Sequence, residues 1–513
     1  MKNMYVLLKV SLILGVLVVG ACQRSTAVST GSKDSLVVIN ASQPWSLDPA
    51  LARDTPSVII MRQVYETLFN QNLQTMEIVP SLAERWAFEN DAQGNPTLLR
   101  LHLKRGVTFH SGDAFTAADV KFSLDRASVS PHLKNMVEAI DRTEVINDYE
   151  ALVVLKFPFA PLLNNLAMPL MSITSEKAVT AGGDSYAQNP IGTGAMKFVT
   201  WVAGNRIELT RFDDYHGQAP RIKDITFRFI ADPATALLEM ETGGADLLLN
   251  VQPQDITRIE SAPNLQLLRA QDFSLEFVGF NVRKPPLDNP KVRQAINHAI
   301  DREAIVRTVF PGAGVPGRGP LSRRVWASAA DILPQYEYDV EKAKRLLAEA
   351  GYPNGFNVKI ITNDGATRID TVSIVLNMLS QVGITAELQI LEWAANLEAA
   401  NRGDHDLTVR SWITVTGDPD YGLEVFHSRA WGAPGNRTFY SNPEVDRLLD
   451  AGRMEIDLAR REQLYIEAQK IIHEEAPWVY ILEGEGRVAA RSNLRGFTID
   501  PTGYHTVWNV WFE

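Results

Sequence analysis

Apolar and polar residues follow two different periods along the chain from Leu36 onward. In residues 54–68 the apolar side chains recur every three or four positions behind an Asp-Thr-Pro start, which predicts a helix. In residues 99–103 apolar and polar side chains alternate, which predicts a strand. Because both kinds of segment alternate along the whole body of the chain, the pattern predicts an α/β fold.

The same patterns predict four further elements. A Thr-Ala-Ala-Asp capping box predicts a helix that begins after Thr116. Residues 198–201 and 207–210 predict the two strands of a hairpin. Helices are also predicted after Pro290 and over residues 464–472, the second one ended by a proline. We expect the apolar stripes of these helices to face the core, and we assign none of them to a cofactor.

The composition narrows the class of protein. The chain has 513 residues, of which 45% are apolar, so it has enough apolar surface for several cores and is not intrinsically disordered. A single cysteine excludes an intrachain disulfide and a CxxC-type zinc site. Fifty Lys and Arg residues against 61 Asp and Glu residues give a net charge of −11. Without a basic cluster, this balance argues against a nucleic-acid partner.

The first 21 residues predict an export signal. The aliphatic run Val10–Val19 is too short for the roughly 20 residues of a membrane span but suits a signal-peptide core. The run ends in a Val-Gly-Ala-Cys sequence that resembles the lipobox of bacterial lipoproteins, in which the chain is cut before a lipid-carrying cysteine. We therefore expect a signal peptide over residues 1–21, lipidation at Cys22, and a flexible tether over residues 22–35. The alternative for Cys22 is a buried core thiol.

Motifs of catalysis and cofactor binding are missing from the sequence. It contains no GxxxxGK[ST], HExxH or GxSxG motif, and no two histidines are spaced i, i+4. Residues 312–317 match GxGxxG, but they follow a helical stretch and include Pro316, so we expect a loop and not a dinucleotide-binding turn. We therefore predict no catalytic residue, no metal site and no cofactor. A secreted hydrolase stays open as an alternative.

Several ordered blocks resemble the dipeptide and oligopeptide-binding family of extracytoplasmic solute-binding proteins, which serve ABC importers (solute-binding protein family 5). The strongest match covers residues 101–123 and combines Leu-Lys-Arg-Gly-Val-Thr-Phe-His-Ser-Gly with Phe-Thr-Ala-Ala-Asp-Val-Lys-Phe-Ser. The other blocks are Leu47–Ala50 with Gln63–Leu68, Ser81–Trp86, Asn189–Ala195, and segments between Phe280 and Arg302.

The resemblance implies a two-lobed periplasmic-binding-protein fold with an extra subdomain and a hinge between the lobes. It also implies a protein outside the cytoplasm that captures a short peptide or peptide-like solute in the interlobe cleft. The solute would pass to the transmembrane subunits of an ABC permease. We expect a monomer held at the membrane by its lipid. The implied boundaries are 36–275 plus 491–513 for lobe I, with the extra subdomain at about 60–185, 276–490 for lobe II, and a hinge near 277–281 and 488–492.

The resemblance also suggests where a ligand amine would bind. In the family, the stretch matching Trp412 to Tyr421 lies at the cleft, and peptide binders carry an aspartate three residues after this tryptophan that clamps the peptide amine. Here that position is Val415, and the carboxylates come later, at Asp418 and Asp420. These carboxylates suit a shifted clamp, but turn chemistry explains them equally well. A ligand without a free amine is the third alternative.

Five further residues are candidates for the ligand site. Trp412 and Tyr421 suit an aromatic wall, although Trp412 would equally suit the core. Arg368 lies close to where dipeptide binders place the arginine that grips the ligand carboxylate, although most helix-end arginines are solvated. Arg437 and Tyr440 follow a Gly/Pro-rich loop and are candidates for the border of the cleft. The altered aspartate position leaves a nickel chelate, an opine or sugar derivative, and a glutathione-like peptide open as ligands.

Overall fold

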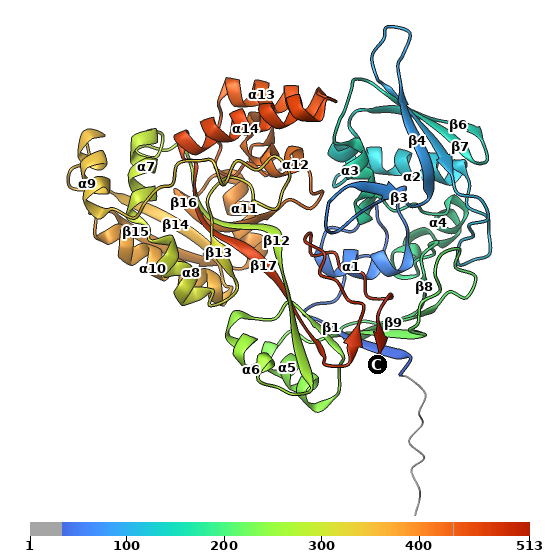
Figure 1. Cartoon of the computed structure of the whole chain (residues 1–513). Coiled ribbons are helices and arrows are strands. Elements are labelled where there is room, and N and C mark those ends of the chain that lie inside the picture. The colour runs from blue at the N-terminus through green and yellow to red at the C-terminus, as the bar shows by residue number, and fades with distance from the viewer. Residues whose placement is uncertain (1–32, 434) are drawn as a thin grey trace, which may run out of the picture.

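The structure is a computed structural model, and it describes residues 33–433 and 435–513. Two α/β halves lie side by side and share one sheet (Figure 1). We call the half that holds β1 and β8–β11 lobe I, and the half that holds β14–β16 lobe II. The predicted signal peptide, Cys22 and most of the predicted tether lie outside the described residues. In the described part of the chain, no helix combines the length and the apolar character that a membrane crossing requires.

An 11-stranded mixed sheet runs through both lobes. Its strand order is β15-β14-β16-β12-β17-β11-β1-β10-β9-β8, and β13 pairs with β17 outside this path. Strands β1, β10 and β11 are parallel in lobe I, and β14, β15 and β16 are parallel in lobe II. The strands are β1 Ser35–Asn40, β8 Met196–Val202, β9 Arg206–Arg211, β10 Asp224–Phe229, β11 Leu247–Leu249, β12 Leu265–Phe280, β13 Gly314–Pro316, β14 Asn357–Asn363, β15 Thr385–Leu391, β16 Leu407–Ile413 and β17 Trp478–Arg491.

Strands β12 and β17 form the antiparallel ladder that joins the lobes. Its register is regular from Leu265–Arg491 to Gln271–Glu485 and resumes at Leu275–Glu483, so residues 272–274 bulge opposite Gly484. A bulge bends and twists a strand. Gly484 leaves room for the Ser274 hydroxyl in this bulge, because a Cβ atom at 484 would lie 2.0 Å from it. On one side of the bulge the ladder packs into the core of lobe I, and on the other into that of lobe II.

Lobe II has helices on both faces of its sheet. Val278 of β12 and Val479 of β17 face a core shared with α7–α10, whereas Phe277 and Trp478, the residues just before them, face α13 and α14. This alternation follows from the period of two in a strand. The helices of lobe II are α7 Pro290–Ala299, α8 Arg302–Val309, α9 Val340–Glu349, α10 Ala366–Ser380, α11 Trp393–Arg402, α12 Pro419–Leu423, α13 Pro443–Met454 and α14 Leu458–Glu475.

Lobe I carries a second sheet with its own core. Its strands are antiparallel in the order β4-β5-β7-β6, and α2 and α3 pack against them. The sequence predicts a subdomain at about 60–185, the region that contains this sheet. The remaining elements of lobe I are α1 Thr55–Val64, β2 Phe69–Gln71, β3 Ile78–Pro80, β4 Ala83–Glu89, β5 Leu98–Leu103, α2 Ala117–Val129, β6 Ile140–Asn147, β7 Glu150–Leu155, α3 Leu162–Ala167, α4 Glu176–Gly182, α5 Pro233–Thr242, α6 Ile256–Glu260, β18 Leu494–Arg495 and β19 Trp511–Phe512.

The structure confirms the predicted α/β class and the elements predicted from local patterns. The Asp54 carboxylate caps α1 by accepting the N–H of Ser57 at 2.7 Å. In the capping box of α2, the N–H of Thr116 donates to the Asp119 carboxylate at 2.9 Å. The loop predicted over residues 312–317 is wrong in part, because its middle forms β13 against β17. Gly314 allows this pairing, since a Cβ atom there would lie 2.3 Å from the carbonyl oxygen of Glu483.

His110 joins two segments that the sequence singled out separately. Its Nε2–H donates to the carbonyl oxygen of Gly194 at 2.8 Å, and its Nδ1 accepts the N–H of Gly192 at 3.4 Å. The carbonyl oxygen can only accept, so the proton of the neutral ring is on Nε2. Burial lowers the pKa of His110 to about 4. Protonation of Nδ1 would also point a donor at the N–H of Gly192.

The buried imidazole predicts that acid destabilises the fold. The folded state holds the pKa of His110 at about 4, whereas an unfolded histidine has a pKa of about 6.5. Between these values the unfolded chain binds the extra proton, so the free energy of unfolding should fall as the pH drops from 6.5 to 4. One such residue contributes up to about 1.4 kcal/mol per pH unit. Urea unfolding of the wild type and of His110→Gln at several pH values measures how much His110 contributes to the pH dependence of the free energy of unfolding.

Other buried histidines act in the same direction, because burial lowers the pKa of His405, His473 and His505 as well. The expected result is therefore a shallower pH dependence in His110→Gln, not a flat one. Val153→Ala is the control, because it removes core volume from the neighbouring sheet without removing a titrating group. It should keep the wild-type slope. Equal slopes in the wild type and His110→Gln would contradict the prediction.

Candidate ligand-binding site

The two lobes meet just beyond the carboxyl end of β16. The side chains of Gln71 and Asn164, both in lobe I, donate to the backbone oxygen of Thr416 at 2.6 and 3.5 Å. In open α/β sheets, ligands bind in the crevice outside the carboxyl ends of the parallel strands. The candidate site is therefore the region around the segment 412–421, where the sequence places most of its ligand candidates.

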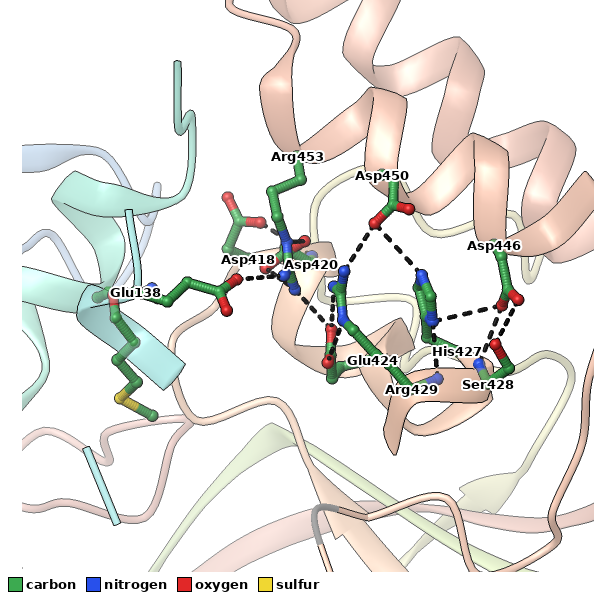
Figure 2. Close-up of polar contacts among 12 residues, drawn as sticks. Glu138, Asp418, Asp420, Glu424, His427, Ser428, Arg429, Asp446, Asp450 and Arg453 are labelled. Carbon is green, nitrogen blue, oxygen red and sulfur yellow. Dashed lines mark hydrogen bonds and ion pairs between the residues drawn. The ribbon is translucent and has the colours of Figure 1, made fainter. Parts of the chain in front are cut away.

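Arg453, at the end of α13, connects the lobes through an ion-pair network (Figure 2). Its guanidinium pairs with Asp420 at 3.0 Å and with Glu424, both in lobe II. The same guanidinium reaches Glu138 of the lobe I subdomain at 2.6 Å. The backbone oxygen of Arg453 also accepts the N–H of Ala160, in lobe I, at 2.9 Å. The lobes are thus in direct polar contact beside the candidate site.

The segment after α12 is fixed to α13 by further polar contacts, which Figure 2 also shows. Arg429 lies between Glu424 and Asp450, at 2.9 and 2.7 Å. His427 contacts Asp450 at 3.2 Å and Asp446 at 3.4 Å. These contacts hold the backbone that carries Glu424 in a defined position relative to Arg453.

The two candidate clamp carboxylates are both engaged by arginines of lobe II. Asp418 makes two contacts of 2.7 Å with Arg461, and both side chains are 4% exposed. Asp418 also caps α12 by accepting the N–H of Asp420 at 2.9 Å, which is the turn role weighed as its alternative. Burial raises the pKa of Asp420, and its partner Arg453 lowers it. An amine-clamping role for either aspartate stays a prediction.

Two other candidates are also held by protein partners. Arg368, in the first turn of α10, pairs with Glu276 of β12 at 2.9 Å and donates to Ser411 at 2.9 Å. Its charge is therefore balanced within the protein. Tyr440 is 2% exposed and donates its hydroxyl to Glu475, so it lies in the core of lobe II. Roles for Arg368 and Tyr440 in binding remain predictions.

Trp412 and Tyr421 form an aromatic pair at the end of β16. Their rings stack with centroids 5.4 Å apart and planes 13° apart. Burial raises the pKa of Tyr421 to about 12, so its hydroxyl stays protonated. The indole N–H of Trp412 is buried without a hydrogen-bond partner among the described residues. The pair is half-buried, which suits a wall between the core and a solute.

Behind Trp412 lies a largely enclosed pocket between β12, β16, the start of β17 and residues 435–438. Its lining combines aromatic rings with hydrogen-bond donors: Phe277, Thr408, Arg410, Ser411, Trp412, Val425, Gly435, Arg437, Thr438 and Trp478. Arg437, a predicted candidate, lines this pocket. Arg410 is a residue that the sequence reasoning missed as a candidate. The sequence pattern that could have identified Arg410 is its spacing. Thr408, Arg410 and Trp412 occupy alternate positions of a buried strand, so their side chains lie on one face of the sheet.

Comparisons with known proteins agree on one family. Residues 77–433 match the family model described as bacterial extracellular solute-binding proteins, family 5 Middle. The chain is 33% identical over 483 residues to the glutathione-binding protein GsiB of Pectobacterium atrosepticum, covering 92% of each chain. It is 32% identical over 503 residues to GsiB of Escherichia coli K12, covering 96% of this chain and 97% of that protein.

Solved structures give the same result for the fold. The DppA protein of Helicobacter pylori in complex with the peptide STSA matches with a TM-score of 0.82 at 28% identity, covering 94% of this chain and 98% of that chain. The AgaA protein of A. tumefaciens R10 in complex with agropinic acid matches with a TM-score of 0.79 at 28% identity, covering 93% and 99%.

The Asp418–Arg461 pair predicts that Asp418→Asn destabilises the fold. Removing one charge of a buried pair leaves the other unpaired, which costs about 3–5 kcal/mol. Urea unfolding measures this loss, and the double variant Asp418→Asn/Arg461→Met should recover part of it. Glu444→Gln is the control, because Glu444 pairs with Arg447 on the exposed face of α13 and should change little. A variant with wild-type stability that no longer binds solute would instead support the clamp.

Proposed function

Because the chain belongs to the family 5 bacterial extracellular solute-binding proteins, we propose that it captures a short peptide or a peptide-like solute for an ABC importer. Proteins of this family bind and release solutes, so the protein is not an enzyme. The observation that carries the proposal is the position of the candidate site. A pocket with unpartnered donors, lined by residues of lobe II, lies along β16, and the chain leads from the end of this strand to Thr416, which lobe I contacts.

Capture works through the two lobes. A solute that contacts both lobes gains some contacts only when the lobes are together, so it shifts the protein toward the closed arrangement. The β12–β17 ladder is the covalent and hydrogen-bonded connection across which the lobes would move, and the bulge at residues 272–274 is one of its two register shifts, the other lying between Glu276 and Phe277. We place the hinge in this ladder. The permease of the importer, which the family implies as partner, would receive the closed protein as a monomer.

The class of solute is suggested by the charged groups that the candidate site leaves available and by the ligands named for the relatives. The family's amine clamp position is Val415, and Asp418 and Asp420 are held by arginines. The relatives include proteins named for glutathione, and structures with a peptide and with agropinic acid. These observations favour a peptide-like acid, such as glutathione, over a plain dipeptide. An opine derivative and a nickel chelate are the alternatives that a ligand panel must include.

Calorimetry on residues 23–513 tests the proposal. We expect binding of one solute per protein from a panel of glutathione, di- and oligopeptides, opines and a nickel–histidine chelate. Small-angle scattering should show a smaller radius of gyration with the bound solute, which should be recovered unchanged. Binding of no peptide-like solute would disprove the assignment of the ligand, and turnover of the solute would indicate a hydrolase.

Glu138→Gln gives this experiment an internal control for closure. It removes the ion pair to Arg453 across the lobes and leaves the residues around Trp412 unchanged. We expect it to bind solute but to compact less. Glu144→Gln should behave like the wild type, because Glu144 pairs with Arg142 inside the subdomain.

The location outside the cytoplasm follows from the family, and the lipid anchor is our proposal. We propose residues 1–21 as the signal peptide and Cys22 as the lipidated residue. In membrane fractionation, the wild type should sediment with the membrane and Cys22→Ala should be released. Ser25→Ala, three residues on, should stay with the membrane. Retention of Cys22→Ala at the membrane would contradict the anchor.

A further inference from the structure

Two arginines at the pocket behind Trp412 have no acidic partner. Arg410 donates to the side-chain oxygen of Asn396 at 2.8 Å, and Arg437 donates to that of Asn401 at 2.9 Å. Both acceptors are neutral amides. Among residues 33–433 and 435–513, neither guanidinium lies within ion-pair distance of a carboxylate.

This lack of a counter-charge is unfavourable in a buried position. Arg410 is 8% exposed, and Arg437 is half-buried. Burial, together with the positive charges of Arg437 and Arg368, lowers the pKa of Arg410 to about 9. Burial also lowers the pKa of Arg437. Buried charges in proteins are normally paired.

Two other buried arginines of the same lobe follow that rule. Arg453 and Arg461 are buried to a similar degree, and each holds at least one carboxylate at 3.0 Å or less. Arg293 and Arg302 are buried too and lack an ion-paired carboxylate among the described residues, but neither lines the pocket, and Arg293 donates to backbone oxygens instead. Arg368, the arginine that the family resemblance suggested, is balanced by Glu276. Arg410 and Arg437 are therefore the arginines at this site whose charge is left for something else to balance.

Other groups around the pocket lack acceptors as well. The indole N–H groups of Trp412 and Trp478 and the hydroxyl of Thr408 are buried without a hydrogen-bond partner among the described residues. All three residues line the pocket with the two arginines. The pocket has a volume of about 10 Å³ in this structure, room for about one water, so its lining must open before a larger group enters. An anion with several acceptor positions would then satisfy these donors, and low exposure to solvent would strengthen its interaction with the guanidiniums.

We propose that Arg410 and Arg437 form a subsite for a carboxylate of the solute, so that the protein selects peptide-like solutes with two or more carboxylates. The inference rests on the proposed function, because it names the part of the captured solute that enters the pocket behind Trp412. A carboxylate fits a guanidinium fork with two parallel hydrogen bonds. The rest of the solute lies between the lobes, beside the Trp412–Tyr421 stack.

Glutathione and its monoethyl ester, which replaces one carboxylate by a neutral group, are the probes. We expect the wild type to bind glutathione about ten- to hundredfold more tightly than the ester by calorimetry. Arg437→Gln and Arg410→Gln should lose most of this preference while keeping their affinity for the ester. Arg437→Lys keeps the charge without the fork, so its preference should be intermediate.

Stability without ligand is the second measurement, because it separates a binding role from a structural one. Removal of an uncompensated buried charge should raise the melting temperature of the ligand-free protein. A structural arginine would lower it. Arg402→Gln is the matched control: it makes the same change of charge on the exposed surface of α11, where Arg402 pairs with Asp404 at 2.8 Å, and should alter neither quantity.

The outcomes distinguish this inference from the proposed function. Equal affinity of the wild type for glutathione and its ester, with variants that bind both alike, would overturn the carboxylate subsite and leave the solute-binding function intact. A wild type that binds no member of the ligand panel would overturn both. A lower melting temperature of both Gln variants together with an unchanged ligand preference would assign the two arginines to the fold.

Discussion

The antiparallel pairing of β12 with β17 is the interaction on which the rest of the structure depends. Both parallel strand groups are attached to it, one through β11 and the other through β16. Its side chains alternate between two cores in lobe II, and beyond the bulge its other end packs into lobe I. The geometry of the interlobe site is therefore set by a ladder whose bulge, with a glycine opposite, lies between the two cores.

Charge is distributed unevenly around this site. Asp418 and Asp420 neutralise Arg461 and Arg453, which leaves the positive charges of Arg410 and Arg437 without a balance. The carboxylates that a sequence search would assign to the ligand are paired with arginines in this structure. The unbalanced charge that remains is positive, which is the sign that attracts an acidic solute to a protein with an overall negative charge.

Local signals in the sequence predicted local structure well. Asp54, the capping box at Thr116 and Asp119, and the hairpin over residues 198–210 each depend on residues within a few positions of one another, and the structure confirms them. The α/β class follows from the same signals. The short strand β13 escaped prediction because its partner lies about 170 residues away, and nothing in a three-residue Gly-Val-Pro segment reports that partner.

The sequence predicted which segment forms the candidate site, but not which side chains pair with one another there. The resemblance pointed to the stretch from Trp412 to Tyr421, and this stretch does lie where the lobes meet. Whether a carboxylate such as Asp418 is free or paired depends on Arg461, which only the tertiary fold brings close. Arg410 shares a strand face with Thr408 and Trp412, but the sequence does not reveal which face of the sheet is covered, so its place at the pocket also depends on the tertiary fold.

Gly484 has a consequence for how natural variation in this chain should be interpreted. It is not among the residues that line the candidate pocket, yet a side chain at this position would force the Ser274 hydroxyl out of its place in the bulge between the lobes. A variant at Gly484 that fails to support growth on the solute would look like a binding-site mutation in a genetic screen. Its defect would instead be one of geometry, with every contact residue intact and the two halves of the site at the wrong angle to each other.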